Sequence, residues 1–133
     1  MDALAQIRAK INDYPGYGTE DDVRAADQMV RAFAGERLAQ LRDRLGAQAE
    51  ALDPLIARAE FANQRALVPF ENPRDTLADT QPLEIADAAL LEAAEAAESV
   101  TPETLAEYAA NVTQLFDRRD ESLMRASIAL RRS

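Results

Sequence analysis

The chain has 133 residues, a formal net charge of −9 and no cysteine, histidine or tryptophan. The lack of cysteine excludes disulfides and thiolate chemistry, and the lack of histidine removes the commonest general base near neutral pH. Ser-His-Asp and Cys-His triads and the Glu-x-x-His pairs of di-iron bundles are therefore excluded. A length close to that of one ordinary domain predicts a single domain over residues 1–133.

The negative charge is concentrated in one part of the chain. Residues 71–107 hold ten acidic residues and one basic residue, so this segment accounts for the whole net charge. Because no basic stripe is present, we expect neither nucleic acid nor a membrane surface as a partner. No apolar run approaches the ~18 residues of a membrane span. The N-terminal sequence lacks the apolar core of a signal peptide, so we expect a cytoplasmic protein.

A first short helix is predicted over residues 2–13. Its apolar residues recur at three- and four-residue spacing, at Leu4, Ile7, Ile11 and Tyr14. Pro15 and Gly16 then end the helix.

The stretch NDYPGYGTEDD, residues 12–22, contains a Gly-x-Gly-Thr pattern that resembles a phosphate cradle at a helix start. The acidic residues of the following helical turn already complement the helix dipole and would repel an anion. Thr19-x-x-Asp22 also fits a capping box. We therefore interpret the stretch as a helix stop followed by a helix start. Tyr14 and Tyr17 are expected to pack this corner with their hydroxyls at its edge.

Apolar residues keep helical spacing from Val23 to Ala62, which predicts one long helix over residues 20–67. Asp53-Pro54 interrupts it, so the helix either kinks there or breaks, with Asp53 capping a new helix. An unbent helix of ~48 residues would reach ~70 Å, which is too long for a domain of this size. A strong bend, or partner chains along the helix, is therefore required.

Gly35 and Gly46 lie inside this predicted helix and are eleven residues apart, so they share one face. Each costs about 1 kcal/mol relative to alanine. They are either tolerated glycines or the mark of another helix crossing closely at that face.

The second half of the chain predicts a strap over residues 68–82 and two helices, over 83–99 and 102–131. Thr101 and Pro102 provide the cap and first turn of the last helix. Two apolar residues are expected to pin the strap to the core: Phe70 and Leu77. The predicted fold is all-α, an antiparallel bundle of four to five helices with one long, kinked central helix.

One candidate surface is the acidic side of the helix over 83–99, which is suited to a basic protein partner. It consists of Asp87, Glu92, Glu95 and Glu98. Glu84-x-x-Asp87 also resembles one half of the paired acidic motif of helical nucleotide pyrophosphohydrolases. That resemblance implies Mg²⁺ bound by carboxylates. Such a site needs carboxylate oxygens that converge from facing helices. Among the facing helices, only the last one offers suitable acidic residues, which are Asp117, Asp120 and Glu121.

The last helix carries the other candidates. Arg119 lies in its apolar stripe, between Leu115 and Leu123. It is expected at the edge of the stripe with its head in water; alternatively it is buried against a carboxylate, or marks a pocket or subunit seam. Two arginines on its flank are expected to lie opposite acidic residues: Arg118 opposite Glu84, and Arg125 opposite Asp75 and Asp79 of the strap.

We therefore predict a non-enzymatic helical bundle that acts through protein–protein contact, as a homodimer or an adaptor. No catalytic, cofactor-binding or metal-binding residue is assigned. Two alternatives remain open: a carboxylate- and Mg²⁺-dependent enzyme acting on a phosphorylated small molecule, and a bundle that binds a small apolar ligand.

Overall fold

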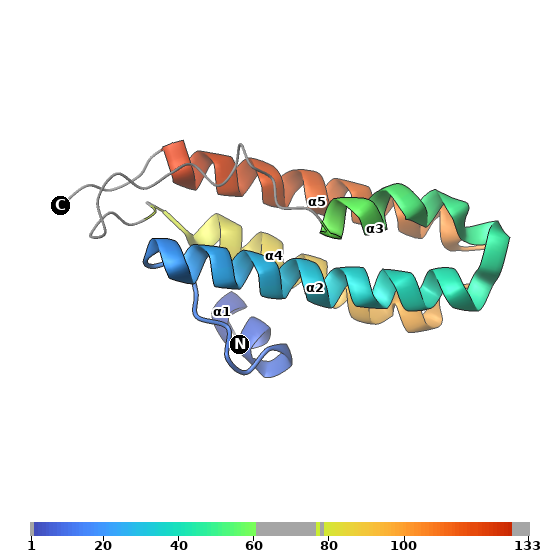
Figure 1. Cartoon of the computed structure of the whole chain (residues 1–133), viewed down its shortest axis with the longest axis horizontal. Helices are drawn as coiled ribbons and strands as arrows, with labels where there is room; N and C mark the ends of the chain where they lie inside the picture. The colour runs from blue at the N-terminus through green and yellow to red at the C-terminus, as the bar shows by residue number, and fades with distance from the viewer. Residues whose placement is uncertain (1, 61–76, 78, 129–133) are drawn as a thin grey trace.

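The computed structural model describes residues 2–60, 77 and 79–128, and all its regular elements are helical (Figure 1). The α-helices are α1 (Ala3–Lys10), α2 (Glu20–Leu45), α3 (Asp53–Glu60), α4 (Gln81–Glu95) and α5 (Leu105–Ile128). Two 3-10 segments follow α2 and α4, η1 (Gly46–Leu52) and η2 (Ala96–Ser99). The predicted all-α class is confirmed. None of the described helices is both long and apolar enough to cross a membrane.

The corner between α1 and α2 is a helix stop followed by a helix start. Helix α1 ends at Lys10, earlier than predicted, because Ile11 has extended backbone angles. Thr19 caps α2 in the predicted capping box: its hydroxyl accepts from the Asp22 N–H at 3.3 Å, and the Asp22 carboxylate accepts from the Thr19 N–H at 3.4 Å. The first-turn acids therefore lie at the positive end of the helix dipole, as the sequence predicted.

The long helical run from Glu20 to Glu60 reverses direction at η1, and α3 returns along α2 (Figure 1). A new α-helix begins at Asp53 with Pro54 in its first turn, as the alternative of a break predicted. Asp53 has helical backbone angles rather than those of a cap, however, and the chain reverses earlier, at η1. The reversal begins at Gly46, whose φ of 68° favours glycine. The Arg42 guanidinium secures it by donating to the Gly46 carbonyl at 2.6 Å and to Asp53 Oδ1 at 2.8 Å. Residues 61–67 of the predicted helix lie outside the described residues.

The two glycines of the long run have different roles. Gly46 opens the reversal, whereas Gly35 lies within α2, facing α3. A Cβ atom at Gly35 would lie 3.1 Å from the Cβ of Ala59, so the two helices approach closely there. The expectation of a close helix crossing is thus confirmed for Gly35 but not for Gly46.

The remaining elements form a second helical pair. Most of the predicted strap, including Phe70, lies outside the described residues, but Leu77 is buried as expected. Helix α4 begins at Gln81, earlier than predicted, and continues into η2. Helix α5 begins at Leu105 rather than at 102, because Thr101 and Thr104 form a turn before it.

Helices α2, α3, α4 and α5 enclose the core, while α1 packs beside α4 (Figure 1). Arg44 of α2 ties the end of α4 to the bundle by donating to the carbonyls of Ala97 at 2.8 Å and Val100 at 3.0 Å. The large apolar side chains that are fully buried are Ile7, Leu38, Leu41, Leu52, Leu83, Leu90, Leu91, Phe116 and Leu123.

Candidate functional site

A buried cluster of charged and polar side chains connects three helices at the centre of the bundle. Arg119 of α5 is only 1% exposed, and its guanidinium lies between two carboxylates. Its Nε donates to Asp87 Oδ1 of α4 at 2.6 Å, and its Nη2 donates to Asp27 Oδ1 of α2 at 2.6 Å. We call Tyr14, Tyr17, Asp27, Asp87 and Arg119 the buried polar network.

The tyrosines of the corner complete the network from the N-terminal side. The hydroxyl of Tyr14 donates to Asp87 Oδ2 at 3.1 Å, and that of Tyr17 donates to the same oxygen. Their rings meet edge to face, with centroids 5.9 Å apart. The prediction that both rings pack the corner is confirmed, but their hydroxyls point inward rather than lying at its edge.

Arg31 extends the network toward α3. Its Nε donates to Asp27 Oδ2 at 2.8 Å, and its Nη1 donates to the carbonyl of Ala59 at 3.1 Å. With Arg31 included, the cluster holds two guanidinium groups and two carboxylates. Both oxygens of each carboxylate are engaged, as buried ion pairs require.

Burial sets the protonation behaviour of this cluster. It raises the pKa of the Asp87 carboxyl, while the Arg119 guanidinium and the two tyrosine hydroxyls oppose that rise. Burial also raises the pKa of Tyr14 and of Tyr17, and the Asp87 carboxylate raises both further, while the Arg119 guanidinium opposes the rise at Tyr17. The pKa of Arg119 lies well above its ordinary value, because the nearby carboxylates outweigh the cost of its burial. Both tyrosines therefore stay neutral and Arg119 stays charged.

Two sequence expectations need correction here. Asp87 was assigned to an exposed partner surface, but it is 0% exposed because its side chain points into the bundle to meet Arg119. Arg119 was expected at the edge of the apolar stripe with its head in water. It is instead buried against two carboxylates, as the alternative prediction for this residue had it.

Asp27 is the network residue that the sequence analysis missed. It lies four residues after Val23 and three before Val30, and is therefore on the apolar side of its helix. Arg119 occupies the equivalent place on α5, and Asp87 on α4. The signal was present in the sequence as charges of opposite sign inside apolar stripes of different helices.

The other three residues of the predicted acidic surface, Glu92, Glu95 and Glu98, are exposed. Glu95 forms an ion pair with Lys10 of α1, which leaves a smaller free acidic face than expected. Glu84 lies toward α1 rather than Arg118. Burial raises its pKa, as do the carboxylates of Asp87 and Asp2.

Among the described residues, the predicted pairings of Arg118 with Glu84 and of Arg125 with Asp79 are not observed, and Asp75 lies outside the described residues. Arg125 pairs within its own helix, with Glu121 at 2.6 Å. Arg118 makes no ion pair within the described part of the chain.

Nor do the acids considered for a Mg²⁺ site converge. Asp117 and Asp120 both pair with Arg58 of α3, each at 2.8 Å. Among the residues that the structure describes, no group of three or more acids is placed to hold a metal ion.

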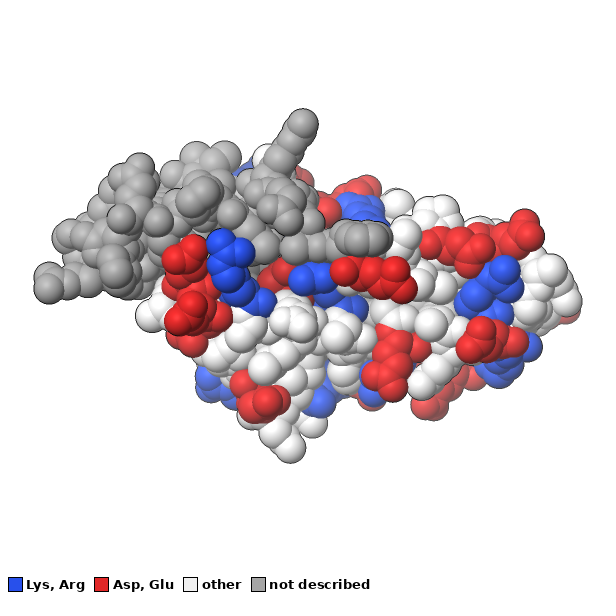
Figure 2. All heavy atoms as spheres, in the orientation of Figure 1, with Lys and Arg blue, Asp and Glu red and all other residues white. Residues whose placement is uncertain are grey.

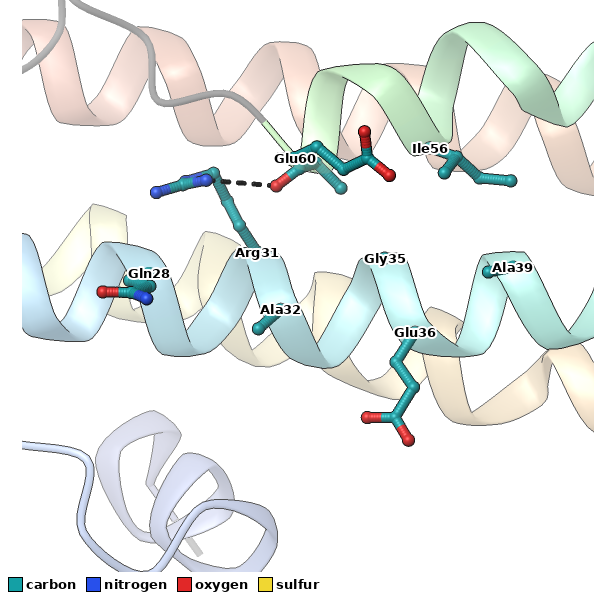
Figure 3. Close-up of a pocket in the computed structure, with 9 residues that line it drawn as sticks. Gln28, Arg31, Ala32, Gly35, Glu36, Ala39, Ile56 and Glu60 are labelled. Carbon is teal, nitrogen blue, oxygen red and sulfur yellow. Dashed lines mark hydrogen bonds between the residues drawn. The ribbon is translucent and has the colours of Figure 1, made fainter.

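A groove with a volume of about 450 Å³ lies between α2 and α3 (Figure 3). We call it the α2–α3 groove. Its floor and walls are mostly apolar, at Ala32, Gly35, Ala39, Ile56 and Ala59; its polar lining is Gln28, Arg31, Glu36 and Glu60. Figure 3 shows Glu60 between the two helices and Glu36 projecting from the far edge of α2.

A smaller hollow of about 210 Å³ lies between α4 and α5. Ile85, which is 54% exposed, borders it together with Arg118 and Arg125. This hollow offers less volume than the α2–α3 groove and carries basic rather than free acidic groups.

Comparison with protein-family models, curated proteins and solved structures finds no match to this chain. The function is therefore inferred from the geometry of the chain itself.

Proposed function

We propose that the chain is a non-enzymatic helical-bundle protein that acts by contact with another protein, bound in the α2–α3 groove. The observation that carries the proposal is the groove, which combines a mostly apolar lining with about 450 Å³ of volume. Grooves between paired helices receive the apolar side chains of a partner helix, which gain hydrophobic free energy as they leave water.

The small side chains of the groove support this use. Ala32, Gly35 and Ala39 follow one another at three- and four-residue spacing on α2, so they share one side of that helix. A ridge of larger side chains on a partner could approach the α2 backbone closely there. Ile56 of α3 supplies the larger apolar surface on the facing wall.

The buried polar network also supports the proposal, because both oxygens of each of its carboxylates are already engaged. Its carboxylates are sealed in the core and paired, so their geometry suits a structural role: they fix how α2, α4 and α5 meet. Contact with other molecules is therefore expected at surface features such as the α2–α3 groove.

Substitution of Ala32 by tryptophan tests the proposal, because Ala32 is exposed on the groove wall and a large side chain there would fill the groove without adding charge. The matched control is Ala110→Trp, at an exposed alanine of α5 outside the groove. Tagged chains are used to capture partners from the native source, with quantitative mass spectrometry. We expect at least one protein captured by the wild type and by Ala110→Trp to fall about tenfold with Ala32→Trp.

An identical set of captured proteins for all three chains would contradict the proposal. Light scattering on the same proteins identifies a second copy as the partner. A wild-type dimer that Ala32→Trp disperses would make the protein self-associating. If the wild type is a monomer at high concentration, the partner is a different protein.

A further inference from the structure

The α2–α3 groove is bordered by carboxylates that have no ion-pair partner among the described residues. Glu36 on α2 and Glu60 on α3 are both exposed, and both line the groove. The one basic residue of the lining, Arg31, is already occupied by Asp27 and the Ala59 carbonyl. The groove therefore presents an apolar lining with uncompensated negative charge.

We propose that the occupant of the α2–α3 groove is a basic amphipathic helix of a partner protein, with apolar residues on one face and lysine or arginine beside them. This inference rests on the proposed function and adds the chemistry of the partner. The apolar face would lie against Ala32, Ala39 and Ile56, and the basic residues would lie near Glu36 and Glu60. Figure 2 shows both acidic and basic side chains around the uncharged surface on the side of the molecule where α2 lies.

The charge of the whole chain favours the same partner. A net charge of −9 attracts a basic partner over a distance and speeds its association, while it opposes association with a second copy. An acidic partner would meet repulsion both at long range and from the carboxylates beside the groove. The hollow between α4 and α5 lacks this agreement. Its Arg125 is already paired with Glu121, and Arg118, which has no ion-pair partner among the described residues, suits an acidic partner that the net charge repels.

The test uses two synthetic helical peptides with the same leucine face, one with lysine and one with glutamate at all other positions. Binding to the full chain is followed by fluorescence anisotropy at low and at physiological salt. We expect the lysine peptide to bind and to weaken as salt is added, because the attraction is partly electrostatic.

Variants locate the binding and separate its apolar part from its charge. Ala32→Trp, which fills the groove and keeps the charge, should lower the affinity for the lysine peptide about tenfold, whereas Ala110→Trp should not. The double variant Glu36→Gln/Glu60→Gln should lower it about threefold or more. Its control, Glu103→Gln/Glu107→Gln, removes equal charge from exposed residues outside the groove and should change it less than about twofold.

The remaining outcomes overturn the inference in distinguishable ways. If the lysine peptide binds Ala32→Trp as well as the wild type, the attraction is general and the groove is not its site. If the glutamate peptide binds in a manner that Ala32→Trp abolishes, the charge assignment is wrong although the proposed function stands. If neither peptide binds, the basic helix is rejected, and the capture experiment decides the proposed function separately.

Discussion

The buried polar network and the α2–α3 groove meet at Arg31, yet they use charge in opposite ways. In the network each carboxylate is buried and both of its oxygens accept hydrogen bonds. In the groove the carboxylates of Glu36 and Glu60 are exposed and have no ion-pair partner among the described residues. The buried, paired carboxylates of the network contribute to the stability of the fold, whereas the exposed carboxylates of the groove are available to bind a partner. Substitutions in the two regions should therefore change different observables.

The largest effect is expected from Arg119→Met. This substitution leaves Asp27 and Asp87 buried without the guanidinium that joins them, and loss of one member of a buried ion pair costs about 3–5 kcal/mol. Urea denaturation followed by circular dichroism measures the free energy of unfolding. The neighbouring Arg118→Met is the control, since Arg118 is exposed, and it should stay within about 0.5 kcal/mol of the wild type. Equal effects from both variants would mean that the network does not set stability.

High pH should weaken the fold through the two network tyrosines. Their pKa values are raised above the ordinary value of 10.0 in the folded state. The unfolded chain therefore loses these protons first, and the stabilisation is complete below pH 10 and falls above it. The expected slope is about 1.4 kcal/mol per pH unit for each tyrosine.

Urea denaturation from pH 8 to 11 measures this slope. Tyr108 adds to it, since burial raises its pKa to about 12. The variant Tyr14→Phe/Tyr17→Phe should be less stable at neutral pH and should lose most of the alkaline slope. If the slope is the same in this variant, the tyrosine hydroxyls are not buried as described.

Gly35→Leu should have an intermediate effect, because it adds a side chain where α2 and α3 are closest. A Cβ atom there already lies 3.1 Å from Ala59, so we expect a loss of about 1–3 kcal/mol in the free energy of unfolding. Ala32→Leu, one turn away on the open groove wall, should cost less than about 0.5 kcal/mol. A Gly35→Leu protein as stable as the wild type would show that α3 does not pack against α2 at this point.

The smallest effect on stability is expected from Glu36→Gln/Glu60→Gln. Exposed carboxylates without ion-pair partners contribute little, so the free energy of unfolding should change by less than about 0.5 kcal/mol. The same variant should nevertheless weaken binding of the lysine peptide. A large loss of stability would show that these carboxylates belong to the structural part of the molecule.

Local sequence patterns predicted the helices well. The capping box of Thr19 and Asp22 involves residues three apart, so it can be read directly from the chain. The reversal at Gly46 could not be read in this way, because the apolar spacing continues in phase through η1 and α3. Whether the spacing means one straight helix or two that face each other depends on contacts such as that of Gly35 with Ala59.

The network was harder to predict because its members lie far apart in the chain. Arg119 and Asp87 were both singled out from the sequence, but only the packing of α4 against α5 shows that they form a pair. Asp27 was missed because an acidic residue on a helix is usually solvated. The α2–α3 groove was missed because it depends on the chain reversal.

The most direct test of the central claim is the nuclear magnetic resonance spectrum of the chain's methyl groups as the lysine peptide is added. Ala32, Ala39 and Ile56 report on the α2–α3 groove, and Ile85 reports on the hollow between α4 and α5. We predict that the groove methyls shift progressively while Ile85 stays unchanged. Shifts at Ile85 without shifts at Ile56 would contradict the account and move the binding surface to α4 and α5.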